Sequence, residues 1–328
     1  MNSIRGEPAV SEVIGFILLL GILVAALVLY NTTVIPASGR ESEIAQMTSV
    51  GEQFADYKLM QDGVWMSRLI NINSPTPAVD IDPVLTTTTL KLGSGGTTQS
   101  GYLSFPLLYP IPSDGTLLFN TSGDTLNIDS SSYHSSPDNK GEFPVNITSL
   151  EYSSNNYYWI QQRYSYQLGG VFLTQNEGTI NRVSPLISMV NSDNRSVVIN
   201  IVPVQIYGNG SLSSNGLAKL DTRQKSTAPY NISASSYHAN TWVNISVSSA
   251  DPATAAMWLQ VFRGIAASEQ LSASAYTAGT TYNPGTNRYI SLISVTGTNP
   301  DPNIKDVTLY VSRVEFEAVI SSTAPSSS

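Results

Sequence analysis

An uncharged apolar segment near the N-terminus constrains this chain more than any other feature. The eighteen consecutive residues from Val13 to Tyr30 carry no charge, and all but the last are apolar or glycine. As an α-helix, at about 1.5 Å per residue, the segment is roughly 27 Å long, close to the thickness of a bilayer's hydrocarbon core. No later stretch approaches its length. The sequence therefore predicts one membrane-spanning helix at residues 10–35, with the rest of the chain on one side of the membrane.

The residues before this helix differ from those of a secretory signal peptide. Such a peptide starts with basic residues and ends its short apolar region at a small-residue cleavage site. Here a single basic residue, Arg5, is offset by the acidic residues Glu7 and Glu12, and the residues from Asn31 to Ile35 contain no small-x-small pattern. We therefore expect the helix to remain in the mature protein.

The leader carries a family resemblance. The segment Arg5-Gly6-Glu7-Pro8-Ala9-Val10-Ser11-Glu12-Val13-Ile14-Gly15 resembles the N-terminus of archaeal type IV pilins and pilin-like surface proteins, which have class III signal peptides. In that family a prepilin peptidase removes a short leader at the cytoplasmic face, and the helix is kept as membrane anchor and then as filament core. The resemblance implies cleavage after Ala9, which leaves Val10 first and residues 1–9 as leader, or alternatively after Gly6, which leaves Glu7 first.

Four residues of the helix are assigned to anchoring and assembly. The resemblance implies that Glu12 pairs with the α-amino group of a neighbouring subunit, although many archaeal members have proline there. An acid at the start of an apolar helix needs a partner, and the alternative is that Glu12 lies at the interface in water. Gly21 and Ala25 form a small-xxx-small pair that lets helices approach closely, and Gly15 belongs to the same segment.

A second, amphipathic helix is predicted at residues 36–67. Pro36 lacks the amide proton that a continuing helix needs, so the first helix should end or kink near Ile35. Ser38 and Glu41 form a capping-box pattern. Apolar residues then recur at helical spacing until Asp62-Gly63, namely Ile44, Met47, Val50, Phe54 and Tyr57. We expect this stripe to pack against the rest of the chain as a stem.

From residue 68 to 320 the helical period gives way to short alternating segments separated by Gly, Pro, Asn, Asp and Ser. In one of them Val243, Ile245 and Val247 face one way and the polar residues between them the other. The sequence thus predicts an α+β fold, in which a long hydrophobic helix and an amphipathic stem precede a large antiparallel, sandwich-like β head. A Ser-rich tail, residues 321–328, follows.

Three details of the head are predicted more closely. The last long segment changes phase near Ser312, which indicates a bulge or bend. A helix should begin with Asp251 as its N-cap and Pro252 as its first residue, and end at Gly264. A repeated pattern, Asn127-Ile128 through His134 and Asn231-Ile232 through His238, raises the alternatives of coincidence or two β units divided near residues 215–228.

Composition and motifs exclude several classes of function. A formal net charge of −8, without clusters of Lys and Arg, counts against a nucleic-acid binder. With no cysteine and two histidines, the chain has no disulfide and no thiolate site, and it shows no motif for a catalytic, cofactor or metal site. We therefore predict that the protein is not an enzyme and has no cofactor.

Two sets of head residues could act at a surface. Tyr157, Tyr158 and Trp159 belong to an aromatic cluster that is either buried in strands or exposed as a platform for sugars and adhesion. Seven Asn-x-Ser/Thr sequons permit glycosylation of an exported head. Asn31 lies close to the membrane, and the remaining candidates are Asn120, Asn146, Asn194, Asn209, Asn231 and Asn244.

Together, these features predict a structural protein. The resemblance implies a subunit of an archaeal type IV pilus-type filament, with an extracellular head for adhesion or surface contacts. The expected partners are other copies of the chain, a prepilin peptidase, the pilus assembly platform and the membrane. The alternative is a single-pass, membrane-anchored surface protein that never polymerises and whose head binds a sugar or envelope component.

Overall fold

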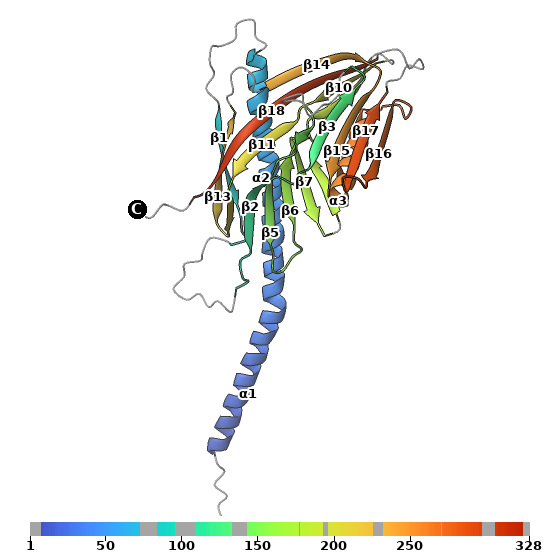
Figure 1. Ribbon diagram of the computed structural model, residues 1–328. Helices are drawn as coiled ribbons and strands as arrows, with labels where there is room; N and C mark the ends of the chain where they lie inside the picture. The colour runs from blue at the N-terminus through green and yellow to red at the C-terminus, as the bar shows by residue number, and fades with distance from the viewer. Residues whose placement is uncertain are drawn as a thin grey trace, which may run out of the picture.

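A computed structural model describes residues 8–72, 84–95, 109–132, 143–176, 178–192, 196–225, 232–269, 271–296 and 306–323. One long N-terminal helix carries a head built of β-sheets (Figure 1). The lower part of the helix projects away from the head, and its upper part runs along the sheets. This α+β arrangement, with a β-rich head after an apolar helix, is the predicted fold.

The long helix continues through Pro36, where the sequence predicted an end or kink. It consists of α1 (Pro8–Leu29), a π-helical segment (Tyr30–Val34) and α2 (Ile35–Ile72). The amide of Ile35 donates to the carbonyl of Tyr30, five residues earlier. This wider turn lies directly before the residue that has no amide proton to donate, and such turns let a helix absorb a local mismatch in its hydrogen-bond ladder. The hydroxyl of Thr33 also bonds to the carbonyl of Leu29 at 2.6 Å.

The stem helix α2 is longer than predicted, because Asp62 and Gly63 lie inside it and it ends at Ile72. Four of the five predicted stripe residues, Met47, Val50, Phe54 and Tyr57, are buried. The fifth, Ile44, is 39% exposed. The buried face therefore leaves out Ile44 and continues towards the N-terminus through Glu43 and Gly39.

The strands form three sheets within the described residues. The seven-stranded sheet contains β1 (Leu85–Lys91), β9 (Ile187–Ser192), β10 (Ser196–Ile201), β11 (Val204–Asn209), β13 (Leu217–Gln224), β14 (Ile232–Asn240) and β18 (Val307–Ser322). The six-stranded sheet contains β2 (Asp114–Asn120), β5 (Ser149–Asn155), β6 (Arg163–Gln167), β7 (Gly170–Gln175), β8 (Gly178–Val183) and β12 (Ser211–Ser214). The five-stranded sheet contains β3 (Thr125–Ser130), β4 (Val145–Asn146), β15 (Val243–Ser249), β16 (Tyr276–Asn283) and β17 (Arg288–Val295). Pairing is antiparallel except where β10 and β11 run parallel to β18.

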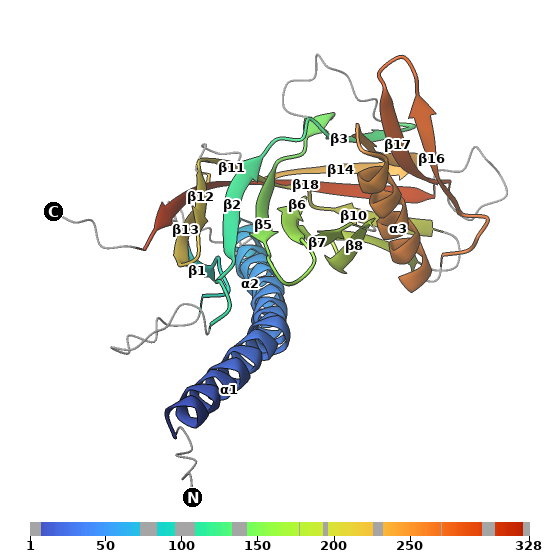
Figure 2. The ribbon, with the colours of Figure 1, turned by 90° about the horizontal axis from the view of Figure 1, so that it is seen from below.

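The long strand β18 connects two hydrophobic cores. Its first half buries Val307, Leu309 and Val311 in a core with α3 (Pro252–Ser268) and the five-stranded sheet. Its second half buries Val314, Phe316 and Ala318 in another core, with α2 and the six-stranded sheet. Figure 2 shows β18 running across the head between these two regions.

The phase shift near Ser312 therefore has a different cause from the predicted bulge. The pairing of β18 with β14 continues without a register change from Val314 to Leu309, past Ser312. A regular strand places neighbouring residues on opposite faces, so β18 buries one face in its first half and the other face in its second half. The change of phase marks the passage from one core to the other.

The cores do not follow a division of the chain near residues 215–228. Each core contains residues from before and after that segment. The two copies of the repeated pattern also lie in different sheets, because Asn127-Ile128 is in β3 and Ile232 begins β14. Asp251 caps α3 as predicted, accepting from the amides of Ala253 and Thr254, but the helix continues past Gly264 to Ser268.

Candidate functional site

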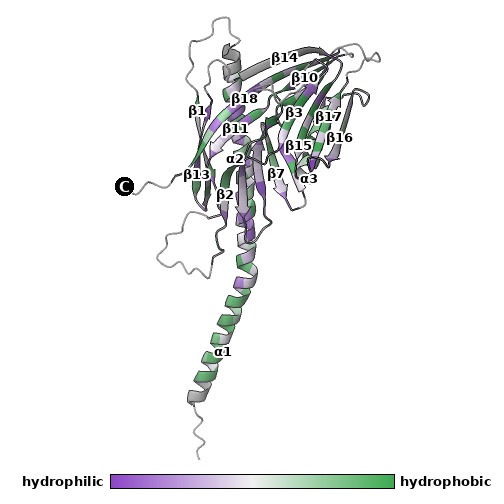
Figure 3. Cartoon of the chain, in the orientation of Figure 1, coloured by the Kyte–Doolittle hydropathy of each residue, from purple (hydrophilic) through white to green (hydrophobic). Residues whose placement is uncertain are grey.

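The N-terminal helix is uncovered over its whole apolar length. Every residue from Glu12 to Val34 is exposed, including large side chains such as Phe16 and Ile22, which are 67% and 72% exposed. Figure 3 shows the apolar residues spread along α1 below the head. In the described part of the chain, this is the one helix long and apolar enough to cross a membrane. Such a surface is unfavourable in water, so it belongs in lipid or against other proteins.

The predicted processing residues lie at the start of this helix. Ala9 and Val10 are in the first turn of α1, which begins at Pro8. The alternative cleavage residues, Gly6 and Glu7, lie outside the described residues. The two predicted cleavage positions therefore differ in their relation to the helix, because cleavage after Ala9 would remove the first two helical residues.

The predicted assembly residues are exposed and do not pack against the part of the chain that the structure describes. Glu12 is exposed and has no hydrogen bond or ion pair with the described residues. A Cβ atom added at Gly15 or Gly21 would meet no atom within 4 Å. Ala25 is also exposed. The small residues of α1 are thus free to receive another helix.

A buried carboxylate joins the stem to the head. Glu43 of α2 is 0% exposed, and its two oxygens accept from the backbone amides of Tyr157 at 2.7 Å and Tyr158 at 2.9 Å. A buried carboxylate must be hydrogen-bonded to be tolerated, and bonds to a charged acceptor are stronger than neutral ones. This contact fixes the loop after β5 onto the helix.

The same loop packs its aromatic side chains on the stem. The ring of Tyr158 lies over Gly39, and its hydroxyl accepts from the amide of Ile111 at 3.1 Å. The guanidinium of Arg40 lies 4.3 Å from the centre of the Trp159 ring, in cation–π geometry. Of the three predicted binding aromatics, Tyr157 is the exposed one, at 62%. Tyr158 and Trp159 are half-buried and contribute to the joint between stem and head.

Further along α2, polar side chains extend this joint. Gln46 donates to the carbonyl of Lys91 at 2.6 Å, and the side chain of Gln53 accepts from the amide of the same residue. The hydroxyl of Tyr57 bonds to that of Thr222 at 3.0 Å. Burial raises the pKa of Tyr57, so its phenol stays neutral. Stem and head are therefore joined by side-chain hydrogen bonds as well as by apolar packing.

Neither Glu43 nor Gly39 was predicted as a contact residue, although the sequence contains a signal for Glu43. Counting back four residues from Met47 along the apolar stripe gives Glu43 rather than Ile44. A charged residue in phase with a buried face indicates a carboxylate with a fixed partner. No sequence signal indicated which loop supplies the two amides.

The sequons differ in their surroundings. Asn146 and Asn209 are exposed, whereas Asn120 is half-buried and donates its amide to Glu151 at 3.0 Å. Asn244 is half-buried in β15, which is paired on both sides. Asn194 and Asn231 lie outside the described residues. Glycosylation stays a prediction, and Asn146 and Asn209 are the most accessible of the described candidates.

Comparison with known proteins identifies no relative of this chain. No family model matches the chain, and no curated protein and no solved structure matches it.

Proposed function

We propose that this chain is a pilin-like subunit of a cell-surface filament, anchored and assembled through its N-terminal helix. The observation that carries the proposal is the uncovered apolar helix, which continues without a break into a stem fixed to the head. The resemblance of residues 5–15 to archaeal type IV pilins supports the same function. Removal of the leader by a prepilin peptidase and extraction by an assembly platform belong to this proposal.

The physical reason for assembly lies in α1. In the membrane its apolar side chains contact lipid, and in a filament they would contact the helices of neighbouring subunits. Gly15, Gly21 and Ala25 are open on the helix surface, so they would let a second helix approach closely. The continuous helix would carry the head at a constant position relative to the filament core, with the β-sheets in the extracellular water for adhesion or contact.

Cross-linking of the helices tests this proposal. The chain has no cysteine, so a single Ala25→Cys variant reports only on helix contacts. We expect Ala25→Cys subunits to form covalent dimers on oxidation in a sheared filament fraction. A matched Thr280→Cys variant, which places the thiol on an exposed residue of β16 in the head, should form few.

The N-terminus of the native protein provides the second measurement. Mass spectrometry should find Val10, or alternatively Glu7, as the first residue of the mature chain. An intact Met1 terminus, together with monomers confined to the membrane fraction, would contradict the filament and favour a non-polymerising, membrane-anchored surface binding protein.

A further inference from the structure

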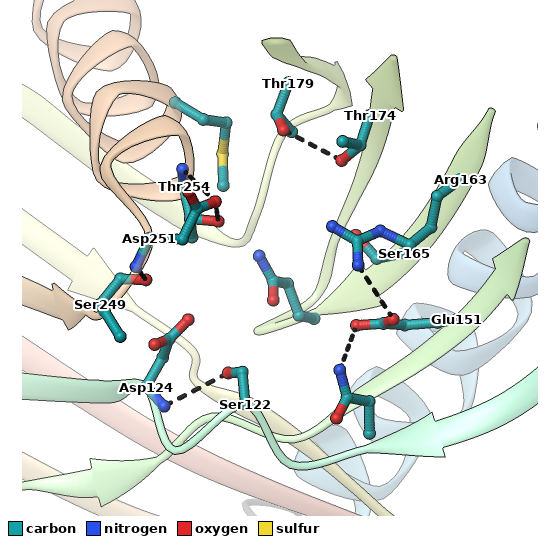
Figure 4. Close-up of a pocket in the computed structure, with 14 residues that line it drawn as sticks. Ser122, Asp124, Glu151, Arg163, Ser165, Thr174, Thr179, Ser249, Asp251 and Thr254 are labelled. Atoms are coloured by element: carbon teal, nitrogen blue, oxygen red, sulfur yellow. Dashed lines mark hydrogen bonds and ion pairs between the residues drawn. The ribbon is translucent and has the colours of Figure 1, made fainter. Parts of the chain in front are cut away.

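A polar pocket of about 180 Å³ lies in the head, away from the stem (Figure 4). Its walls come from the six-stranded sheet, the residues that precede β3, the end of β15 and the N-terminus of α3. The pocket therefore lies where three parts of the head meet, a common place for a binding site.

One face of β6 supplies the floor of the pocket. Arg163, Ser165 and Gln167 alternate along this strand and all line the pocket. Tyr164 and Tyr166, which lie between them, point to the opposite face and are buried in the core around the stem. The polar residues therefore lie on the face of the sheet turned away from α2.

The charged groups of the pocket are held in place by the protein itself. Glu151 accepts from Asn120 at 3.0 Å and lies 3.7 Å from a guanidinium nitrogen of Arg163. Asp124 pairs with Arg288 at 3.0 Å. Asp251 is fixed as the N-cap of α3. Burial acts to raise the pKa of Asp251, but hydrogen bonds from Thr254 and Ala253, with Arg163 nearby, outweigh it and hold the pKa below its usual value.

Two polar side chains open into this pocket without a hydrogen-bond partner among the described residues. Gln167 is 9% exposed and Ser165 is 8% exposed, and neither side chain forms a hydrogen bond with the part of the chain that the structure describes. An amide and a hydroxyl each both donate and accept, so these two groups are available to a ligand that does the same.

The mixture of groups selects the chemistry of the ligand. Three carboxylates disfavour an anion, and the described residues contain no group of three or more acidic, His or Cys residues placed to hold a metal ion. Carboxylates accept, Arg163 donates, and Gln167 and Ser165 do both. A set of hydroxyl groups on one small ring satisfies all of them, because each hydroxyl can donate and accept.

We propose that this pocket binds a single neutral sugar ring, either a free monosaccharide or the terminal residue of a glycan. Its volume is below the roughly 300–1,000 Å³ of pockets for drug-sized ligands, which fits one ring rather than an oligosaccharide. The pocket lies wholly in the head, so sugar binding does not require filament assembly, and either property can fail without the other.

Ligand-detected NMR with the full-length protein tests this proposal. The protein is held in lipid nanodiscs, since alkyl-glycoside detergents carry sugar headgroups. The probes are glucose, galactose, mannose and N-acetylglucosamine, with galacturonic acid as an anionic comparison. We expect saturation transfer to at least one neutral sugar and little to the acid. An array of immobilised glycans then shows whether the free sugar or a glycan terminus binds more tightly.

Variants assign the binding to this pocket. Gln167→Leu should weaken sugar binding by about tenfold, since it removes a donor and an acceptor. Gln175→Leu, on the neighbouring strand β7 and outside the pocket, should leave binding unchanged. Ser165→Ala provides a second, smaller change if Gln167→Leu fails to fold. Absence of binding to every neutral sugar, preference for the acid, or binding unaffected in both pocket variants would overturn the proposal.

Discussion

The ring of Tyr158 occupies the space above Gly39 of the stem helix, so that a Cβ atom added at Gly39 would clash with Cδ2 of the ring. The hydroxyl of Tyr158 also accepts a hydrogen bond from Ile111, so the ring is held at both ends of its side chain. Glycine is therefore required here for close approach, although it weakens a helix interior.

We expect Gly39→Ala to destabilise the protein by about 1–3 kcal/mol, because the ring or the helix must move. Gly63→Ala is the matched control in the same helix. An added Cβ there meets no atom within 4 Å, and the variant should gain up to about 1 kcal/mol from helix propensity. Thermal unfolding measures both, and equal midpoints for the two variants would contradict the contact.

Replacing Glu43 should loosen the loop from the stem. Glu43→Ala leaves the amides of Tyr157 and Tyr158 without their charged acceptor, which costs about 1–3 kcal/mol. Hydrogen exchange at these two amides should accelerate by a larger factor than exchange elsewhere in the head. Glu41→Ala, at an exposed position two residues earlier, serves as the control. Unchanged exchange at Tyr157 and Tyr158 in Glu43→Ala would show that the carboxylate does not hold the loop.

The proposed function makes a prediction about Glu12. Glu12→Gln keeps the size of the side chain and removes the charge that would pair with a neighbouring subunit's α-amino group. We expect normal membrane insertion, since an amide is less costly than a carboxylate in lipid, and a lower yield of sheared filaments. The control is Glu41→Gln, which changes an exposed acid of the stem. Equal filament yields for the two variants would show that the charge of Glu12 does not pair with a neighbouring subunit during assembly.

The shared strand β18 predicts that the head unfolds as one unit. Leu309→Ala and Phe316→Ala each remove a fully buried side chain from a different core, and each should cost about 2–5 kcal/mol. Because the same strand contributes to both cores, calorimetry should show a single transition that shifts downward in both variants. Two separate transitions, with each variant shifting one, would indicate independent units. Glu317→Ala, an exposed position on β18, should change little.

Sequence periodicity located the large elements of this fold well. The uncharged run predicted α1, and helical spacing predicted the buried residues Met47, Val50, Phe54 and Tyr57. The N-cap at Asp251 was predicted from its local pattern, because capping depends on residues within one turn. These features depend on residues that are close together in the sequence, so the sequence alone predicts them.

Features that depend on distant residues were harder to predict. Pro36 indicated a break, but a π-turn and packing of α2 on the sheets keep the helix continuous. The phase shift near Ser312 predicts a bulge or bend, because one sequence does not show that a strand passes between two cores. The pocket was missed for the same reason, since Asp124, Arg163 and Asp251 come together only through the packing of sheets and helix.

The buried tyrosines of the second core predict sensitivity to alkaline pH. Burial raises the pKa of Tyr152 to about 12 from an ordinary value of 10.0, and it raises the pKa of Tyr57 and Tyr166 as well. Between pH 10 and pH 12 the unfolded chain loses these protons while the folded chain keeps them, so stability falls as pH rises. Each such tyrosine lowers the free energy of unfolding by about 1.4 kcal/mol per pH unit in that window.

Tyr152→Phe removes one of these titrating groups, so its free energy of unfolding should fall less steeply, by about 1.4 kcal/mol less per pH unit. At pH 8 the variant should be less stable than the unaltered chain, because the hydrogen bond to the carbonyl of Leu92 is lost. Denaturant unfolding measured from pH 8 to pH 12 checks this, and equal slopes for the variant and the unaltered chain would show that Tyr152 does not stay neutral.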